Sequence, residues 1–190
     1  MFPHAGCELN FRTPYELLVA TMLAAQCTDK RVNIVTEQLF LVANTPEKMA
    51  EINPEKLEKL IFSCGFYREK AKNLIKCAKS LLELYNGVVP DTIEQLQKLA
   101  GVGRKTASVV VAIAFGKPAM PVDTHVFRVA RRLGLSKSNT PLGVERDLRA
   151  VFCEKDLPDI HNQLIFFGRY HCKAMRPNCA DCELIGVCGE

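Results

Sequence analysis

The chain has 190 residues, a 48% share of apolar residues, nine cysteines and a formal net charge of +4. This length suits one large core or two modest domains, and because no stretch reaches the roughly 18 uncharged apolar residues of a membrane span, a membrane-spanning class is excluded. The first residues lack the charged and then apolar order of a secretion signal, which predicts a cytoplasmic protein without disulfides.

The positive charge is unevenly distributed along the chain. Residues 1–100 contain 12 basic and 12 acidic side chains, whereas residues 101–190 contain 13 basic and 9 acidic ones. Between residues 104 and 137, seven basic side chains accompany a single acid, Asp123. Such an excess favours a polyanion as partner, and the ordinary alternative is a solvated basic face.

Helix signals dominate the first half, and no run alternates as a strand would, so the fold class is all-α. A capping box at 13–16 begins a helix through Ala24, and Thr28 caps the next one. The pairs at 45–46 and 53–54, each a capping residue followed by proline, begin a short helix and then one that runs towards Phe62 and ends at Gly65. Residues 68–85 form an apolar stripe at helical spacing, which predicts a core helix that includes Cys77.

A helix-hairpin-helix follows. A capping box at 91–94 begins a short helix, the loop 100–103 comes next, and an apolar helix runs from Lys105 to Phe115. Gly101 and Gly103, on either side of Val102, allow a tight turn with positive φ and a close backbone approach to a ligand. The helix then opens with Arg104, Lys105 and Thr106, and its free N–H groups and positive dipole end suit a phosphate.

The second half continues with helices and ends in cysteines. Asp123 or Thr124 caps a helix whose arginines at 128, 131 and 132 are expected to cluster outward. Pro141 and Pro158 each precede a further helix, and the last helix runs through 164–167 into the cysteine-rich tail.

Cys172, Cys179, Cys182 and Cys188 have the spacing C-x6-C-x2-C-x5-C, which indicates a metal site. Zinc is one candidate, but a single compact run of four thiolates is more typical of an iron-sulfur site. The basic residues Lys173 and Arg176 lie between the first two cysteines, so a loop pinned by metal bonds would present them to a phosphate backbone. The other five cysteines are expected to be small buried hydrophobes.

Five segments together resemble the bacterial endonuclease III family, base-excision DNA glycosylases with a helix-hairpin-helix and a Gly/Pro-Asp loop. They are Leu99–Ala107 (LAGVGRKTA), Val122–His125 (VDTH), the cysteine tail, and the pair Leu23–Asp29 (LAAQCTD) with Cys64–Tyr67 (CGFY). The resemblance covers nearly the whole chain. It implies a two-domain fold, with a central helical domain at 7–117 and a discontinuous domain at 1–6 and 118–190 that holds a [4Fe-4S] cluster on Cys172, Cys179, Cys182 and Cys188.

The same resemblance implies an enzyme and its substrate. The expected activity is excision of oxidised pyrimidines and cleavage of the strand by β-elimination, carried out by a nucleoid-associated monomer on double-stranded DNA with damaged bases or abasic sites. DNA would lie across a cleft between the domains, with Lys105 and Asp123 facing it from opposite sides. Gly101, Val102, Gly103, Arg104 and Thr106 would contact the backbone.

Three departures from the family pattern concern rigidity, the intercalating side chain and the start of the chain. Ala100 stands where proline is usual, so the free hairpin should be slightly less rigid. Phe66 stands where a leucine commonly wedges into the base stack, and an aromatic ring should keep that function with altered preference. The chain also begins later than the family's first helix does.

Lys105 is the expected nucleophile. A lysine at a helix start is usually a solvated charge, but Arg104 and the positive helix end both favour the neutral amine. That amine can attack the sugar C1′ of a flipped nucleotide, which releases the base and leaves a Schiff base that permits β-elimination.

Asp123 has two possible roles, because its carboxylate can stabilise the sugar cation or accept the lysine proton, and it can also simply cap a helix. Gln26 and Phe66 are expected to fill the space left by the flipped base, with a polar helix end and a core aromatic as their alternatives. His125 is expected to be structural. The competing functions are a monofunctional, adenine-removing glycosylase and a DNA-binding module without catalysis.

Overall fold

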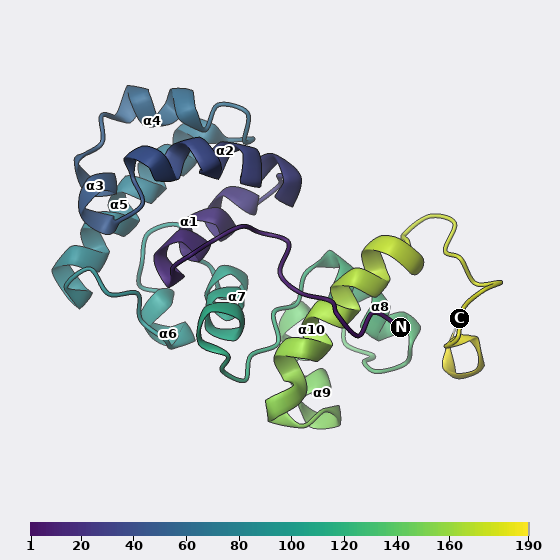
Figure 1. Ribbon diagram of the computed structural model, residues 1–190. Helices are drawn as coiled ribbons and strands as arrows, with labels where there is room; N and C mark the ends of the chain where they lie inside the picture. Colours follow the sequence, from purple (N-terminus) through teal and green to yellow (C-terminus); the bar gives the residue numbers. More distant parts are fainter. Residues whose placement is uncertain (190) are drawn as a thin grey trace. The chain divides into compact units, whose positions relative to one another are not determined.

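A computed structural model describes residues 1–189, and all of its regular elements are helices, as the sequence predicts (Figure 1). The α-helices are α1 Pro14–Ala24, α2 Asp29–Val42, α3 Pro46–Glu51, α4 Pro54–Leu60, α5 Tyr67–Tyr85, α6 Ile93–Leu96, α7 Arg104–Phe115, α8 Thr124–Arg132, α9 Pro141–Val151 and α10 Leu157–Phe166. Two 3-10 turns, η1 Glu154–Asp156 and η3 Ile185–Val187, and a π-helix, η2 Phe167–His171, complete them. None of the described helices has the length and apolar character that crossing a bilayer requires.

Capping side chains set most of the helix starts. Thr13, Thr28, Thr45, Asn53 and Thr140 each accept a hydrogen bond from a backbone N–H in the first turn of the helix that follows. Each such bond satisfies one of the N–H groups that a helix start leaves unpaired. The predicted starts at Thr13, Thr28, Thr45 and Asn53 are therefore confirmed.

The predicted start of α6 and the predicted end of α4 are wrong. The helix α6 is capped by Thr92, which accepts from the N–H of Gln95, and so it begins one residue later than a cap at Asp91 would give. The helix α4 ends at Leu60 with Ile61 as its cap, well before Gly65. The residues between α4 and α5 form turns, so α4 ends several residues before the glycine that was expected to end it.

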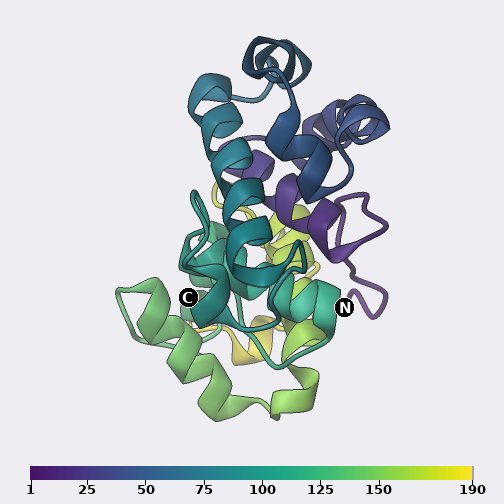
Figure 2. The ribbon, with the colours of Figure 1, turned by 90° about the vertical axis from the view of Figure 1, so that its left-hand side faces the viewer.

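The chain divides into two compact units, one of Glu8–Phe115 and one of Met1–Cys7 with Gly116–Glu190. In the first unit α1 packs against α7, and α5 packs against α3 and α4; Figure 2 shows α5 lengthwise. Its core includes the fully buried Leu17, Leu23, Leu74 and Leu81, and Cys77 is buried with them as expected. The two domains expected from the sequence, 7–117 and the discontinuous 1–6 with 118–190, remain a prediction.

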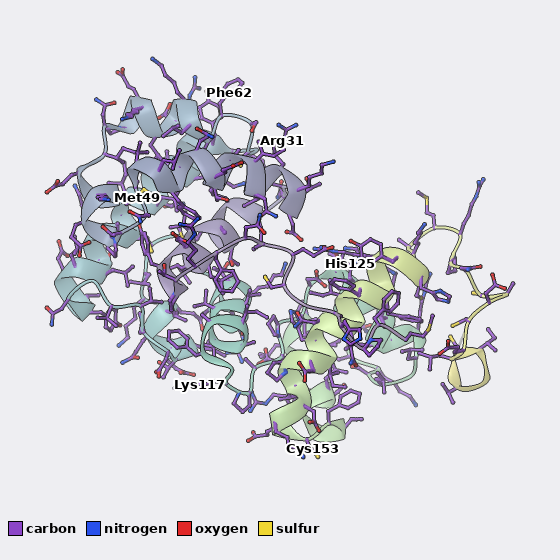
Figure 3. All side chains as sticks on the ribbon, in the orientation of Figure 1. Arg31, Met49, Phe62, Lys117, His125 and Cys153 are labelled. Carbon is purple, nitrogen blue, oxygen red and sulfur yellow. The ribbon has the colours of Figure 1, made fainter. Side chains whose placement is uncertain are left out.

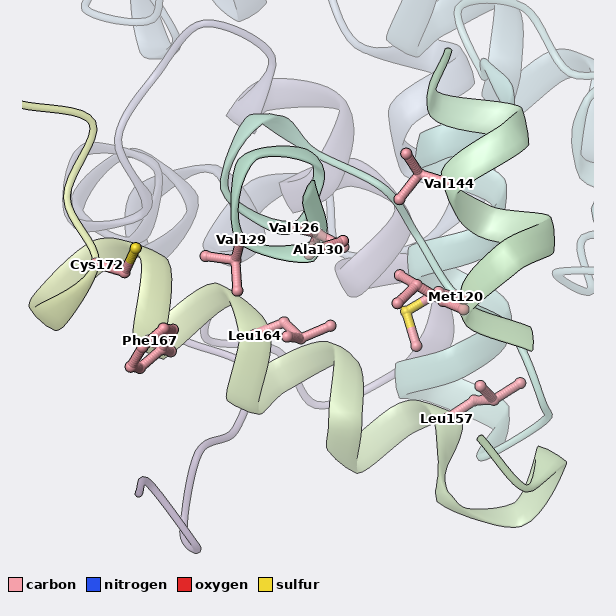
Figure 4. Close-up of a cluster of buried hydrophobic side chains, with 10 residues drawn as sticks. Met120, Val126, Val129, Ala130, Val144, Leu157, Leu164, Phe167 and Cys172 are labelled. Atoms are coloured by element: carbon pink, nitrogen blue, oxygen red, sulfur yellow. The ribbon is translucent and has the colours of Figure 1, made fainter. Parts of the chain in front are cut away.

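The second unit has its own core between α8, α9 and α10 (Figure 4). Val126, Val129 and Ala130 of α8 are fully buried there, as their spacing predicts, and Leu164 and Phe167 approach them from the other side. Cys172 belongs to the same buried cluster, with Cys182 packed against it. The cysteine segment is thus anchored to this core at its first residue.

Candidate active site and cysteine segment

The hairpin between α6 and α7 requires glycine at position 101 for two reasons. Gly101 has φ +74°, a left-handed conformation that side chains rarely adopt. A Cβ added there would lie 2.8 Å from Cβ of Asn73 and 3.1 Å from Cε of Met22. The hairpin is therefore held tightly against α1 and α5, and the following Val102 is buried beneath it.

Gly103 differs from Gly101, and the expectation of positive φ at both glycines is wrong. Gly103 does not have a left-handed φ, and an added Cβ would meet no atom within 4 Å. Its carbonyl accepts from the N–H of Ala107 at 3.0 Å, so it stands at the cap position of α7. The fold itself therefore tolerates a side chain at position 103.

The two glycines should respond differently to substitution. We expect Gly101→Ala to lower the free energy of unfolding by about 2–4 kcal/mol, because it adds both backbone strain and a steric clash. Gly103→Ser should change it by no more than about 0.5 kcal/mol, because serine is at least as good a cap as glycine. Urea denaturation of both variants measures the difference; equal losses would show that Gly103 is also constrained by the fold.

The side chains that open α7 are accessible. Arg104 and Lys105 are exposed and Thr106 is half-buried, while Ala107 is fully buried. The helix begins at Arg104, one residue earlier than expected. Lys105 thus lies in the first turn of α7.

Asp123 is the N-cap of α8. Its Oδ1 accepts from the N–H of His125 at 2.9 Å and from that of Val126 at 2.8 Å. The capping alternative is therefore correct, and Thr124 is not the cap. Both hydrogen bonds use Oδ1, so the capping of α8 does not occupy Oδ2 of this half-buried carboxylate.

Gln26 and Phe66 lie in two turns that touch each other. Each has a left-handed backbone, with φ of 55° and 57°, and each side chain is exposed, Phe66 to 69%. A Cβ on Gly65 would lie 3.7 Å from the carbonyl oxygen of Gln26, so the turns are in backbone contact. The alternative that Phe66 is a core aromatic is excluded, and Gln26 lies beyond the end of α1.

A buried lysine that sequence reasoning missed holds these turns together. Lys70 Nζ, on α5, donates to the carbonyl oxygens of Leu23 at 2.8 Å and Ala25 at 2.7 Å. Burial lowers the pKa of Lys70, and the nearby Cys64 and Cys27 thiols oppose that shift. A lysine within an amphipathic helix carries no local signal of such a contact.

Two arginines of α8 hold the cysteine segment, which corrects the expectation that they cluster outward. Arg128 Nη2 donates to the carbonyl oxygens of Gly168 at 2.7 Å and Cys172 at 3.1 Å. Arg132 Nη1 donates to the carbonyl oxygen of Lys173 at 2.8 Å and lies 3.5 Å from Sγ of Cys172. These guanidinium groups organise the protein chain and are not simply a free basic face.

The π-helix η2 makes this contact possible. The N–H of Cys172 donates to the carbonyl oxygen of Phe167, five residues back, at 2.7 Å. A Cβ on Gly168 would lie 2.9 Å from Cβ of His125 and 3.2 Å from Cγ2 of Val129. Gly168 thus lets α8 approach η2, and the structural role expected of His125 remains a prediction.

The four cysteines supply the thiolate ligands that an iron-sulfur cluster requires, and two of them contact the same arginine. All four thiols are free; Cys172 is buried, Cys182 and Cys188 are half-buried, and Cys179 is exposed. Arg132 contacts Sγ of Cys172, and its carbonyl oxygen accepts from Sγ of Cys188 at 3.5 Å. Over residues 1–189, no three Cys, His, Asp or Glu side chains are arranged to hold a metal ion. The donor set therefore fits a four-thiolate site.

Lys173 and Arg176 are both exposed on the loop between the first two cysteines, and Arg176 has φ +52°. The side chains therefore project from a loop that Arg132 holds by the carbonyl oxygens of Lys173 and Ala174. Their expected contact with DNA remains a prediction.

The fold and these motifs define the protein family. Residues 19–153 match the model of the HhH-GPD superfamily base excision DNA repair proteins, and the chain belongs to this family, as the sequence resemblance predicted. Within it, the chain is 51% identical over 191 residues to endonuclease III of Bacillus subtilis (strain 168), covering 100% of this chain and 87% of that protein. It is 45% identical over 186 residues to endonuclease III of Escherichia coli (strain K12), covering 98% and 88%.

Solved structures agree with this assignment. A trapped endonuclease III–DNA covalent intermediate superposes with a TM-score of 0.96 at 49% identity, covering 100% of this chain and 90% of that chain. A thermostable thymine-DNA glycosylase, at 24% identity and a TM-score of 0.87, shares the fold.

Proposed function

We propose that the chain is a bifunctional DNA glycosylase and AP lyase of base excision repair, acting as a monomer on double-stranded DNA that contains oxidised pyrimidines or abasic sites. The observation that carries this proposal is Lys105, an exposed amine in the first turn of α7, directly after a hairpin fixed by Gly101. The similarity to a protein trapped as a covalent intermediate with DNA supports a nucleophilic role for this amine.

The reaction follows from the chemistry of these groups. The neutral amine of Lys105 attacks C1′ of the flipped nucleotide, the bond from C1′ to the base breaks, and the base leaves with its electron pair. Ring opening gives a Schiff base between Nζ and C1′, which acidifies the neighbouring carbon and allows β-elimination of the 3′ phosphate. Oδ2 of Asp123 stabilises the positive charge that develops on the sugar or takes the proton of the ammonium.

Gln26 and Phe66 are proposed to fill the gap that the flipped nucleotide leaves. Unstacking and unpairing a base costs a few kcal/mol, which an inserted side chain offsets. The two side chains are exposed on adjoining turns, so one amide and one aromatic ring are presented together. The ring offers stacking surface, and the amide offers hydrogen bonds to the base left without a partner.

The hairpin and the cysteine loop are proposed to hold the phosphate backbone. In the hairpin, the N–H groups around Gly103 and the side chains of Arg104 and Thr106 would contact phosphates near Lys105. Because Gly103 has open space around its Cα, a phosphate can approach the backbone there.

The cysteine loop contributes two charges whose effect can be measured. Reversing both, Lys173→Glu with Arg176→Glu, should weaken binding of any duplex and reduce the slope of log K against log[salt] by roughly 2, about one for each lost phosphate contact. Fluorescence anisotropy over a range of salt gives the slope. The matched control reverses Arg146 and Lys155, exposed basic residues elsewhere in the same unit, and should leave it nearly unchanged. An unaltered slope in the Lys173/Arg176 variant would remove these residues from the interface.

The four cysteines, Cys172, Cys179, Cys182 and Cys188, are proposed to hold a [4Fe-4S] cluster. The cluster, when bound, supplies a covalent crosslink that fixes the loop carrying Lys173 and Arg176. Protein purified without oxygen should contain about four iron and four sulfide per chain, by the stoichiometry of the cluster. One zinc and no sulfide would instead support the alternative metal. Elemental analysis with visible absorption spectroscopy decides between them.

The activity is tested with a panel of duplexes that carry an oxidised pyrimidine, an abasic site, or adenine opposite a mismatch. We expect base release and strand cleavage on the first substrate and cleavage on the second. Borohydride should trap a protein–DNA adduct on both, because only a Schiff base is captured. Base release without cleavage or adduct would indicate a monofunctional glycosylase, and binding alone would indicate a module without catalysis.

A further inference from the structure

Aromatic and basic side chains that the proposed reaction does not use lie on either side of Phe66. Phe62 projects outward between α4 and α5, and its side chain is 67% exposed (Figure 3). The half-buried ring of Tyr67 lies beside it, with the ring centroids 5.0 Å apart and the planes tilted by 57°. The guanidinium carbon of Arg68 lies 5.4 Å from the centroid of the Tyr67 ring. These three side chains, Phe62, Tyr67 and Arg68, form one surface, here called the aromatic platform.

The fold fixes the aromatic platform from beneath. Ile61 and Cys64 are fully buried, and the N–H of Cys64 donates to the carbonyl oxygen of Ile61 at 2.9 Å. This closed turn leaves Phe62, which lies inside it, pointing away from the core. On the other side, α5 begins with Tyr67 directly after Phe66. A phenylalanine is among the side chains most often buried, so an exposed ring held by anchored backbone on both sides is available to a ligand.

Exposed rings next to a cation suit an unpaired nucleotide. Every base has a π-face, so an aromatic ring can stack on it whatever the sequence, and a basic group can meet the phosphate. The side chain of Arg68 is 79% exposed, and its contact with Glu58 is long, at 3.9 Å between Nε and Oε2. An exposed ion pair of this kind is weak and leaves the guanidinium able to bind a phosphate. Because the bases of an intact duplex already stack on one another, the ligand that fits best is a single strand.

We propose that the aromatic platform binds single-stranded DNA, with one unpaired base stacked on Phe62 and a phosphate on Arg68. Lys59 and Ser63, close to Phe62 in the chain, are exposed as well. This combination of a ring with polar and basic groups suits a nucleotide better than it suits the apolar face of a partner helix. The bound strand would lie next to Phe66, the side chain proposed to enter the duplex.

The inference rests on the proposed function in one respect, that the partner is DNA. It goes beyond that function because the ligand needs no damaged base, no abasic site and no complementary strand. The aromatic platform would therefore favour DNA in which nucleotides are already unpaired beside the lesion.

The experiment uses tryptophan fluorescence. The chain contains no tryptophan, so Phe62→Trp places a single reporter on the aromatic platform. The full-length variant, with its metal site loaded, is titrated with a short oligothymidylate that carries no lesion. A base stacked on an indole ring quenches its emission, and we expect the emission to fall by about half or more at saturation. An intact duplex of the same length should quench it far less, and equal quenching by the two ligands would overturn the proposal.

The matched reporter is Leu84→Trp. Leu84 is 58% exposed on the same helix, about 25 Å along the axis from Tyr67. Its emission should not respond to the oligothymidylate, and similar quenching at both positions would show non-specific binding and overturn the proposal. Quenching of Phe62→Trp that grows with protein concentration without DNA would overturn it in favour of a contact between copies of the chain.

Affinity gives a second readout, by fluorescence anisotropy of a labelled oligothymidylate. Phe62→Ala should weaken binding roughly fivefold or more, the lower end of what stacking one base on a ring contributes. Phe62→Tyr keeps the ring and should bind as the wild type does, and Leu84→Ala should stay within about twofold of it. All of these positions are exposed, so the thermal midpoints should be retained. Unchanged affinity in Phe62→Ala would contradict the proposal.

Cleavage of an abasic duplex by the same samples separates this inference from the proposed function. Quenching of Phe62→Trp by the oligothymidylate, in a protein that cleaves no abasic DNA, would refute the proposed function and support the aromatic platform. Normal cleavage without quenching would support the function and refute the aromatic platform.

Discussion

Replacing Lys105 with glutamine is expected to abolish strand cleavage and borohydride trapping, with a fall in turnover of roughly 10⁴-fold or more. This is the scale of loss when the group that forms the covalent intermediate is removed. Glutamine keeps the length and helix propensity of the side chain, and because Lys105 is exposed, the fold should be unaffected. Single-turnover cleavage of an abasic duplex, with trapping on the same sample, measures both effects.

The matched control for this variant is Lys98→Gln. Lys98 is exposed on the other side of the hairpin, three residues before Gly101, so the substitution removes the same charge close by. Its cleavage rate should stay within about twofold of the wild type, because a single exposed charge contributes little. Comparable losses in both variants would mean that Lys105 acts only through the local positive charge and forms no covalent bond.

Replacing Asp123 with asparagine should separate the two roles of this residue. Asparagine retains an oxygen that accepts from the N–H groups of His125 and Val126, so the capping of α8 and the thermal midpoint should be kept. The negative charge is lost, and removing one electrostatic stabiliser of a transition state costs about 10²–10³-fold in turnover. Turnover close to the wild type would show that Asp123 only caps the helix.

Asp123→Ala and Thr140→Ala complete this comparison. The alanine at 123 removes the cap as well as the charge, so it should lose about 1 kcal/mol of stability in addition to the turnover defect. Thr140 caps α9 in the same unit by accepting from the N–H of Gly143 at 3.1 Å, and Thr140→Ala should lose a similar stability with full activity. A turnover defect in Thr140→Ala would mean that destabilisation of this unit is sufficient to impair catalysis.

Local chemistry explains why much of the fold could be predicted from the sequence. Threonine or asparagine before a helix, with proline after it, marks a start through bonds that span three residues, and these starts are confirmed. The turn at Gly101 was predictable for the same reason, because positive φ is a property of one residue. The family could also be predicted, since its motifs are short runs of neighbouring residues.

Contacts between residues far apart in sequence could not be predicted in this way. Arg128 and Arg132 resemble solvated arginines on a helix, yet their partners lie about 40 residues further along the chain, at Gly168, Cys172 and Lys173. Lys70 reaches carbonyl oxygens 45 and 47 residues before it. Only the tertiary fold brings such donors and acceptors together, and the pattern of residues along the sequence does not indicate these contacts.

The left-handed backbone at Gln26 and Phe66 implies a conflict between stability and activity. Neither residue suits positive φ, and each such conformation costs of the order of 1 kcal/mol, more for a bulky ring than for an amide. Glycine would relieve that strain at both turns. A programme to make this enzyme more heat-resistant would therefore select glycine at these two positions early, and would gain robustness by discarding the side chains proposed to enter the duplex.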